Sequence, residues 1–182
     1  MINKKKFEDV EETASDLIFK YKIDEPAIPI EILAQNEGLT VTPYDFGDDV
    51  SGVLVIKDNK GVIGYNKSHS KVRQRFTIAH ELGHYLLHKG TSKKEEVFVD
   101  KDFIIKFRNK ENSYDKNEAR QEIEANAFAA ALLMPKAFLF VEFEQNDYSN
   151  LSEADLISRL AKKFNVSVLA MTYRLANLNL FH

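Results

Sequence analysis

Cysteine is absent from this sequence of 182 residues. The chain therefore forms neither a disulfide framework nor a metal site built from thiolates. No apolar run approaches the ~18–20 residues that a membrane-spanning helix needs, and residues 1–19 contain no apolar segment typical of a signal peptide. These absences predict a soluble protein in a reducing compartment, which we expect to be the cytoplasm.

A strong charge of one sign is also missing, because 25 basic and 28 acidic residues leave a net charge of −3. Such a balance provides no global attraction to nucleic acid. The sequence shows no internal repeat, and its hydrophobic content of 44% is ordinary for a globular protein with a proper core. At this length we expect one domain over residues 1–182.

Hydrophobic periodicity predicts an α+β fold in which helices and a small sheet are mixed. We expect helices over about 5–21, 29–37, 70–88, 116–134, 136–144, 152–164 and 167–178. We expect strands over 39–44, 51–57 and 61–66, the last two forming a hairpin. Residues 95–108 are predicted to be a strand or an extended segment, and 110–117 a loop.

The segment RFTIAHELGHYLLH, residues 75–88, is largely apolar but carries three histidines and a glutamate. His80, Glu81 and His84 fit the pattern HExxH. Two imidazoles at positions i and i+4 lie on one helix face, where both can reach one Zn²⁺ at ~2.0–2.1 Å. Glu81 lies beside the pair, where it can act as a general base toward a water molecule activated by the metal. The pattern predicts a zincin-like helical core.

Two further residues of this helix need an explanation. Gly83 in the middle of a helix costs roughly 1 kcal/mol relative to alanine, so we expect another element to approach closely there. His88 lies eight residues after His80, about 12 Å along the helix axis, which is too far for both to bind one ion. We therefore expect His88 to be a supporting contact of the site, a cleft residue or a surface residue.

A zinc site also needs a third protein ligand. His69 and His182 are candidates, but neither lies in a recognisable helical context. Residues 118–135, EARQEIEANAFAAALLMP, are the better source, because Glu122 falls on the alanine-rich face of the predicted helix. Coordination of a cation would remove the cost of burying this carboxylate. Glu122 is therefore predicted as the third ligand.

Two other side chains of the same helix can be placed by periodicity at 100° per residue. Asn126, one turn after Glu122, is predicted to hydrogen-bond a ligand histidine and so support the site. Glu124 lies about 160° from Glu122 on a helical wheel, and we expect it to face solvent.

The two blocks RFTIAHELGHYLLH and EIEANAFAAALLMP together resemble the ImmA/IrrE family of zinc metallopeptidases. The resemblance extends backward to GVIGYNKSHSKVRQRFT and forward to NVSVLAMTYRLANL. It implies that His80, His84 and Glu122 bind one Zn²⁺ and that Glu81 is the general base. It also implies cleavage of a helix-turn-helix transcriptional repressor, in the setting of bacteria, phages and mobile elements.

A competing hypothesis comes from DLISRLAKKFNVSVLAMTYRL, residues 155–175, which has a helix-turn-helix-like pattern with basic residues nearby. The alternative function is a DNA-binding or partner-binding regulator whose metal site is structural. We expect instead that the C-terminal helical part, about 136–182, completes the core or shapes a substrate cleft. Direct DNA binding is the less favoured reading because the segment lacks a strongly basic surface.

The residue that stabilises the oxyanion of a hydrolytic reaction is not identified by the sequence. Donor side chains near the two motifs or in the C-terminal segment are candidates: Tyr85, His88, Tyr114, Tyr173 and Arg174.

Overall fold

The computed structural model describes residues 4–58, 60–89, 96–101 and 116–180. Its helices are α1 (Lys4–Lys20), α2 (Ile30–Asn36), α3 (Lys71–His88), α5 (Lys116–Leu133), α6 (Lys136–Gln145), α7 (Glu153–Phe164) and α8 (Val168–Asn177). Its strands are β1 (Leu39–Tyr44), β2 (Val50–Lys57), β3 (Lys60–Asn66) and β4 (Glu96–Lys101). The α+β class predicted from the sequence is confirmed.

The strands form one mixed sheet in the order β1-β3-β2-β4. β1 runs parallel to β3, whereas β2 is antiparallel to both β3 and β4. Leu54 on β2 pairs with Ile63 on β3, and both side chains are fully buried. This buried side of the sheet packs against α3, so the helix that carries the HExxH pattern lies directly on β2 and β3.

The described part of β4 covers six residues of the segment that the sequence predicted as extended. Within the described residues, β4 forms the edge of the sheet next to β2. The remainder of that segment and the loop predicted up to residue 115 lie outside the described residues.

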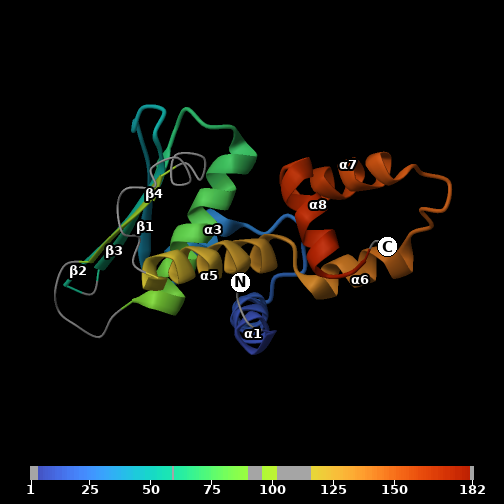
Figure 1. The fold of residues 1–182 in the computed structure, drawn as a ribbon, viewed down its shortest axis with the longest axis horizontal. Coiled ribbons are helices and arrows are strands. Elements are labelled where there is room, and N and C mark those ends of the chain that lie inside the picture. The colour runs from blue at the N-terminus through green and yellow to red at the C-terminus, as the bar shows by residue number, and fades with distance from the viewer. Residues whose placement is uncertain (1–3, 59, 90–95, 102–115, 181–182) are drawn as a thin grey trace.

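α3 lies between the sheet and α5, as Figure 1 shows. A Cβ atom added to Gly83 would lie 3.0 Å from Cδ1 of Phe128 and 3.3 Å from Cα of Ala125, both on α5. The close approach that was predicted for Gly83 is therefore confirmed, and its partner is the alanine-rich helix. α1 packs against α5 as well, so α5 has neighbours on two of its faces.

α7 and α8 lie at the end of the molecule opposite the sheet in Figure 1. Asn165 ends α7 in a left-handed conformation with φ of 52°, and the Ser167 hydroxyl caps α8 by accepting a hydrogen bond from the Ala170 amide. Phe164 and Met171 are fully buried in the same apolar core that contains residues of α3 and α5. This tight turn fixes the two helices against the core.

One stretch of the described chain, residues 117–145, is long and apolar enough by composition to cross a membrane, although no apolar run of that length was expected from the sequence. It consists of two helices, α5 and α6, that are separated at Pro135. Half of its most apolar window is buried inside the protein, as is usual for core helices, so length and composition are weak evidence for a membrane span here.

We predict that Gly52→Ala destabilises the packing of β2 on α3. The added Cβ would lie 2.3 Å from Cγ2 of Thr77 and 3.1 Å from the carbonyl oxygen of Gly64. Neither atom belongs to a long flexible chain, so we expect the free energy of unfolding to fall by about 1–3 kcal/mol. Urea denaturation of the purified variant measures this loss.

Gly61→Ala is the matched control for this prediction. Its Cβ would meet mainly Cδ2 of Leu39, at 2.2 Å, and the end of a leucine side chain can rotate away. We expect a loss below about 1 kcal/mol. Equal losses of stability for the two variants would show that Gly52 is packed no more tightly against α3 than Gly61 is against Leu39.

Candidate metal centre

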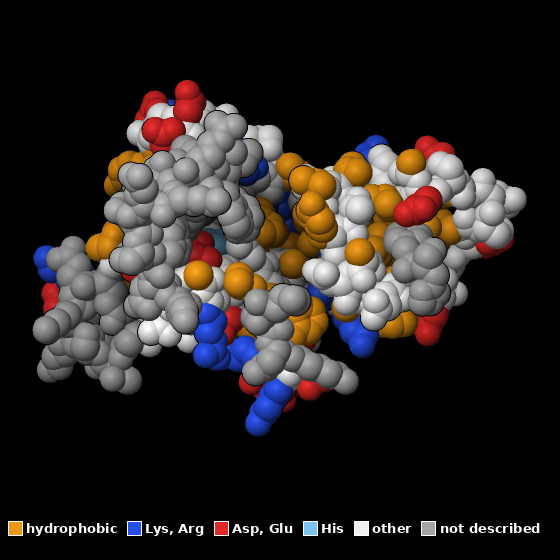
Figure 2. Space-filling view, viewed as in Figure 1, with side chains coloured by type: hydrophobic (Ala, Val, Ile, Leu, Met, Phe, Trp, Pro, Cys, Tyr) orange, Lys and Arg blue, Asp and Glu red, His pale blue; other side chains and the backbone are white. Residues whose placement is uncertain are grey.

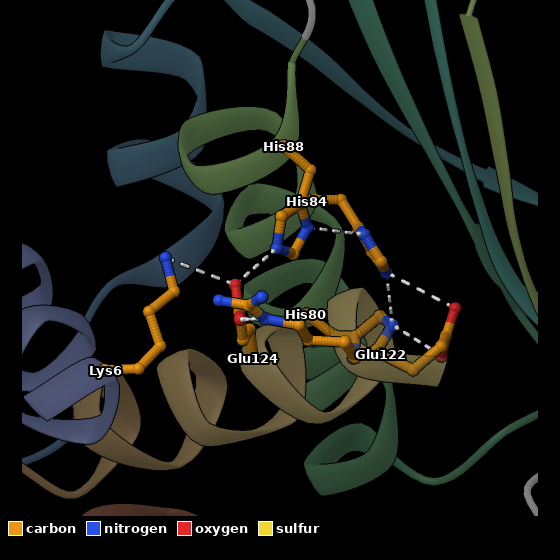
Figure 3. A network of polar contacts seen from close by, with 7 residues as sticks. Lys6, His80, His84, His88, Glu122 and Glu124 are labelled. Carbon is orange, nitrogen blue, oxygen red and sulfur yellow. Dashed lines mark hydrogen bonds and ion pairs between the residues drawn. The ribbon is translucent and has the colours of Figure 1, made fainter. Parts of the chain in front are cut away.

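His80 and His84 extend from the face of α3 that meets α5, and Glu122 extends toward them from α5 (Figure 3). The Nε2 atoms of the two histidines are 3.0 Å apart. The Glu122 carboxylate lies 3.6 Å from each of them, through Oε2 to His80 and through Oε1 to His84. The histidine side chains are 2% exposed and the glutamate side chain 20%. Three potential ligand atoms therefore converge at one point.

These distances can be compared with what a tetrahedral ion requires. With bonds of ~2.0–2.1 Å, neighbouring ligand atoms lie about 3.3 Å apart. The two imidazole nitrogens are 3.0 Å apart, and each lies 3.6 Å from a different oxygen of the Glu122 carboxylate, so all three distances lie close to that value. The group of His80, His84 and Glu122 could hold a metal ion. Two imidazoles and one carboxylate also form a donor set that catalytic zinc sites use, with the fourth position left for water or substrate.

The other ring nitrogen of His80 is engaged from α5. Nδ1 of His80 lies 3.0 Å from Oδ1 of Asn126, which is one helical turn after Glu122. An amide oxygen is only an acceptor, so this contact places the hydrogen of a neutral His80 on Nδ1 and directs the lone pair of Nε2 toward Glu122. The helix that supplies the carboxylate thus also orients the ring of its partner ligand.

The second ring nitrogen of His84 meets His88. Their Nδ1 atoms are 3.1 Å apart, and Nε2 of His88 lies 3.2 Å from Oε2 of Glu124. The prediction that Glu124 faces solvent was wrong, since this residue is only 3% exposed. The helical-wheel argument allowed α5 one buried face, whereas α3 and α1 together cover two.

Charged groups surround Glu124. Nε of Arg120 donates a hydrogen bond of 2.7 Å to Oε1, and Nζ of Lys6 on α1 lies 3.4 Å from Oε2. Burial raises the pKa of Glu124, but hydrogen bonds from Arg120 and His88 and the charge of Lys6 outweigh it, so this pKa lies below its ordinary value. Glu124 is therefore a carboxylate at neutral pH. Burial lowers the pKa of His88 below its ordinary value, and the contact with Glu124 only partly offsets this effect.

Glu81, the predicted general base, is completely buried in α3. Its Oε1 lies 3.2 Å from the position that a Cβ on Gly52 would occupy. The absence of a side chain at Gly52 therefore leaves room for the Glu81 carboxylate between α3 and β2.

The sheet also reaches the site. The ring of Phe98 on β4 stacks on the ring of His84, with centroids 4.8 Å apart and an angle of 26° between the planes. Figure 2 shows histidine and carboxylate surface at the bottom of a hollow on this face of the molecule. The two histidine side chains are almost fully buried, and the Glu122 side chain is the more exposed of the three at 20%.

The other sequence candidates lie in different surroundings. The hydroxyl of Tyr85 accepts a hydrogen bond from Lys89 at 3.1 Å, and the Tyr173 side chain is 64% exposed on α8. Arg174 is 2% exposed and donates to the Glu11 carboxylate and to the carbonyl oxygen of Met134. Arg174 thus connects α8 with α1 and the end of α5, which is a structural role.

Three candidates remain, Tyr114 for the oxyanion and His69 and His182 for the metal. Tyr114 and His182 lie outside the described residues. His69 lies at the turn before α3, where its backbone carbonyl accepts a hydrogen bond of 2.8 Å from the Gln74 side chain. It does not belong to the group of His80, His84 and Glu122 whose ligand atoms converge.

Sequence reasoning missed the contacts of Lys6, Arg120 and Phe98 around the site. Arg120 and Glu124 are four residues apart on one helix, and so are His84 and His88, so local spacing could have indicated both pairs. No sequence signal could have placed Lys6, which is more than 110 positions from Glu124, or Phe98, whose position depends on the pairing of β4 with β2.

Comparison with known proteins gives a family match and matches to solved structures. The model of the IrrE N-terminal-like domain, a peptidase family designated M78, matches residues 34–176. A solved structure described as a Mycobacterium tuberculosis transcriptional regulator aligns with a TM-score of 0.59 and 18% sequence identity. The alignment covers 93% of this chain but 46% of that one, so the chain spans less than half the length of the regulator. No curated protein gives a significant match.

We predict that Glu122→Ala strongly weakens metal binding without unfolding the protein. The variant removes one of three converging ligand atoms, and this loss should exceed the 10–100-fold effect typical of residues that only support a ligand. Competition between the purified protein and a chromophoric chelator for Zn²⁺ measures the affinity. An affinity within about threefold of wild type would show that Glu122 is not a ligand.

We also predict that Gly83→Ala weakens metal binding by separating α3 from α5. The new methyl group would press on Ala125 and Phe128 and so move Glu122 away from the histidines. The expected loss is about 10-fold, as for other disturbed supports of ligands. Ser158→Ala, at an exposed position of α7, is the control. Unchanged affinity for Gly83→Ala would mean that the spacing of the two helices does not set the site.

Proposed function

Because this chain belongs to the ImmA/IrrE family, we propose that it is a zinc-dependent endopeptidase that cleaves a helix-turn-helix transcriptional repressor encoded nearby. The family match supports peptidase activity at the level of the family. The observation that carries the proposal for this chain is the convergence of His80, His84 and Glu122, with Glu81 next to the first ligand in the same buried helix.

The chemistry follows from the roles that these side chains can fill. A bound Zn²⁺ would polarise the scissile carbonyl group and lower the pKa of a coordinated water to about 7. The Glu81 carboxylate accepts the proton of the attacking water and passes it to the amine that leaves. Asn126 and His88 hold the rings of His80 and His84 through their second nitrogens. The ligand side chains therefore keep their orientation while the substrate is hydrolysed.

The neighbouring strand offers a way to bind the substrate chain. β4 is an edge strand among the described residues, and its Phe98 lies against His84. An extended segment of a polypeptide can pair with the free edge of such a strand. Pairing with β4 would hold a peptide bond beside the metal centre, and it requires a substrate segment that is extended rather than helical.

A role in transcription is supported by the fold comparison only in a general way. The aligned solved structure is named as a transcriptional regulator, and the resemblance of the two motif blocks implies a repressor as the substrate. The similarity to a transcriptional regulator and the expected repressor substrate are both consistent with a cytoplasmic protein. The donor set suits Zn²⁺, although sites built from nitrogen and oxygen also accept Mn²⁺, Fe²⁺ or Co²⁺.

The alternative function is a DNA-binding regulator that uses α7 and α8. Their arrangement is helix-turn-helix-like, but three of the basic side chains are already engaged. Lys163 pairs with Glu142, Arg174 pairs with Glu11, and Arg159 lies over the ring of Tyr148. Few cations of this segment are left for phosphate groups, and this favours the peptidase over the DNA-binding hypothesis.

We predict that Glu81→Gln abolishes cleavage but retains the metal. An amide cannot accept a proton from water, and general bases contribute about 10²–10⁴-fold to a rate, so the repressor should remain intact. Co-expression with the helix-turn-helix repressor encoded beside the gene, followed by immunoblotting and a reporter of the repressed promoter, measures the effect. Metal content of the purified variant confirms that the site is loaded.

Glu118→Gln is the matched control, because Glu118 is an exposed glutamate on α5. This variant should cleave the repressor like wild type. If Glu81→Gln relieves repression as well as wild type does while the repressor stays intact, the protein acts by binding and not by hydrolysis. A shift of duplex DNA by the purified protein, weakening as salt rises, would support the DNA-binding alternative instead.

A further inference from the structure

The second nitrogen of His84 is supported differently from that of His80. Asn126 accepts from His80 directly, whereas His84 meets another histidine, which can either donate or accept. Figure 3 shows the sequence of contacts from His84 through His88 to Glu124 and on to Lys6. Which way the hydrogens point along these contacts decides whether His84 can bind a metal.

We infer that His84, His88 and Glu124 form a directional hydrogen-bond chain, in which the Glu124 carboxylate fixes the tautomer of His88 and thereby that of His84. The inference rests on the metal site of the proposed function and adds His88 and Glu124 to it as positioning residues. Both side chains are about 5% exposed or less, so water does not compete for their hydrogen bonds.

The direction of these hydrogen bonds follows from the Glu124 carboxylate, which is the last group in the series. A carboxylate can only accept, so Nε2 of His88, 3.2 Å from Oε2 of Glu124, carries the hydrogen. Nδ1 of a neutral His88 is then an acceptor. It lies 3.1 Å from Nδ1 of His84, which must donate to it. The lone pair of His84 is left on Nε2, the atom that faces His80 and Glu122.

The opposite direction would prevent metal binding. If His88 donated from Nδ1 to His84, the hydrogen of His84 would lie on Nε2 and point at the other ligand atoms. The remaining lone pair of His88 would then face the Glu124 carboxylate at 3.2 Å, which is electrostatically unfavourable. The negative charge of Glu124 therefore selects the tautomer that leaves His84 able to coordinate a cation.

The Glu124 carboxylate, the last group of this hydrogen-bond chain, is itself held in place. Arg120 binds Oε1 from the same helix, one turn earlier, and Lys6 approaches Oε2 from α1. α1 (Lys4–Lys20) lies before the residues 34–176 that match the family model. A helix outside the matched segment thus contributes to the support of a metal ligand, which a description of the ligands alone would omit.

The test measures Co²⁺ affinity by competition with a chromophoric chelator, and does not depend on activity. Glu124→Ala and His88→Phe each break the chain, and we expect both to bind Co²⁺ 10–100-fold more weakly than wild type. Glu124→Gln keeps an acceptor oxygen for His88 and should recover most of the loss, to less than about 10-fold. Glu118→Ala, at an exposed position one turn before Glu122, is the control and should bind like wild type.

A second measurement reads the tautomers directly and needs no variant. In zinc-loaded wild-type protein with ¹⁵N-labelled histidine, long-range ¹H–¹⁵N correlation spectra should show the hydrogen of His84 on Nδ1 and that of His88 on Nε2. A hydrogen on Nδ1 of His88 would overturn the inference, and so would affinities of both chain-breaking variants within about threefold of wild type. If wild type binds no Co²⁺ at all, the metal site and the proposed function fail together.

Discussion

The close approach of α3 and α5 is the constraint on which the metal centre depends. The two helices meet where Gly83 faces Ala125 and Phe128, with no room for another side chain. His80 and His84 lie on either side of this contact in sequence, and Glu122 lies one turn before Ala125 on the opposing helix. A glycine and a run of alanines, which give little apolar area of their own, thus bring three polar groups within bonding range of one ion.

The second consequence of this packing concerns α5, which lies between α3 and α1. One face of α5 presents Glu122 and Asn126 to the ligand histidines, while a second face presents Glu124 to His88 and Lys6. A buried carboxylate is unfavourable unless it is paired and hydrogen-bonded, and here both oxygens of Glu124 have partners. The same helix therefore supplies a ligand, an amide that orients one histidine and a charge that orients the other through His88.

Much of this could be predicted from the sequence, because the determinants are local. The strand pattern around residues 50–66, the helices and the i,i+4 spacing of His80 and His84 all depend on short-range periodicity, and the structure places them as expected. Gly83 was informative because it contradicts local helix preference. The choice of Glu122 over His69 depended on which face of α5 turns inward, a question that alanine content could answer.

The surroundings of Glu124 could not be predicted in this way. A helical wheel assigns one inward and one outward face, and it fails for a helix that is packed on two sides. The approach of Lys6 and the stacking of Phe98 on His84 depend on how distant segments meet in space. The substrate and the residue that stabilises the oxyanion are likewise not specified by the spacing of any motif in the sequence.

Anomalous diffraction at the zinc absorption edge, from crystals of the zinc-loaded protein, would locate the bound ion and its ligands directly. We expect one strong peak at about 2.0–2.2 Å from Nε2 of His80, Nε2 of His84 and the Glu122 carboxylate. A peak bound by other residues, or a fully folded protein that takes up no zinc at this position, would contradict it.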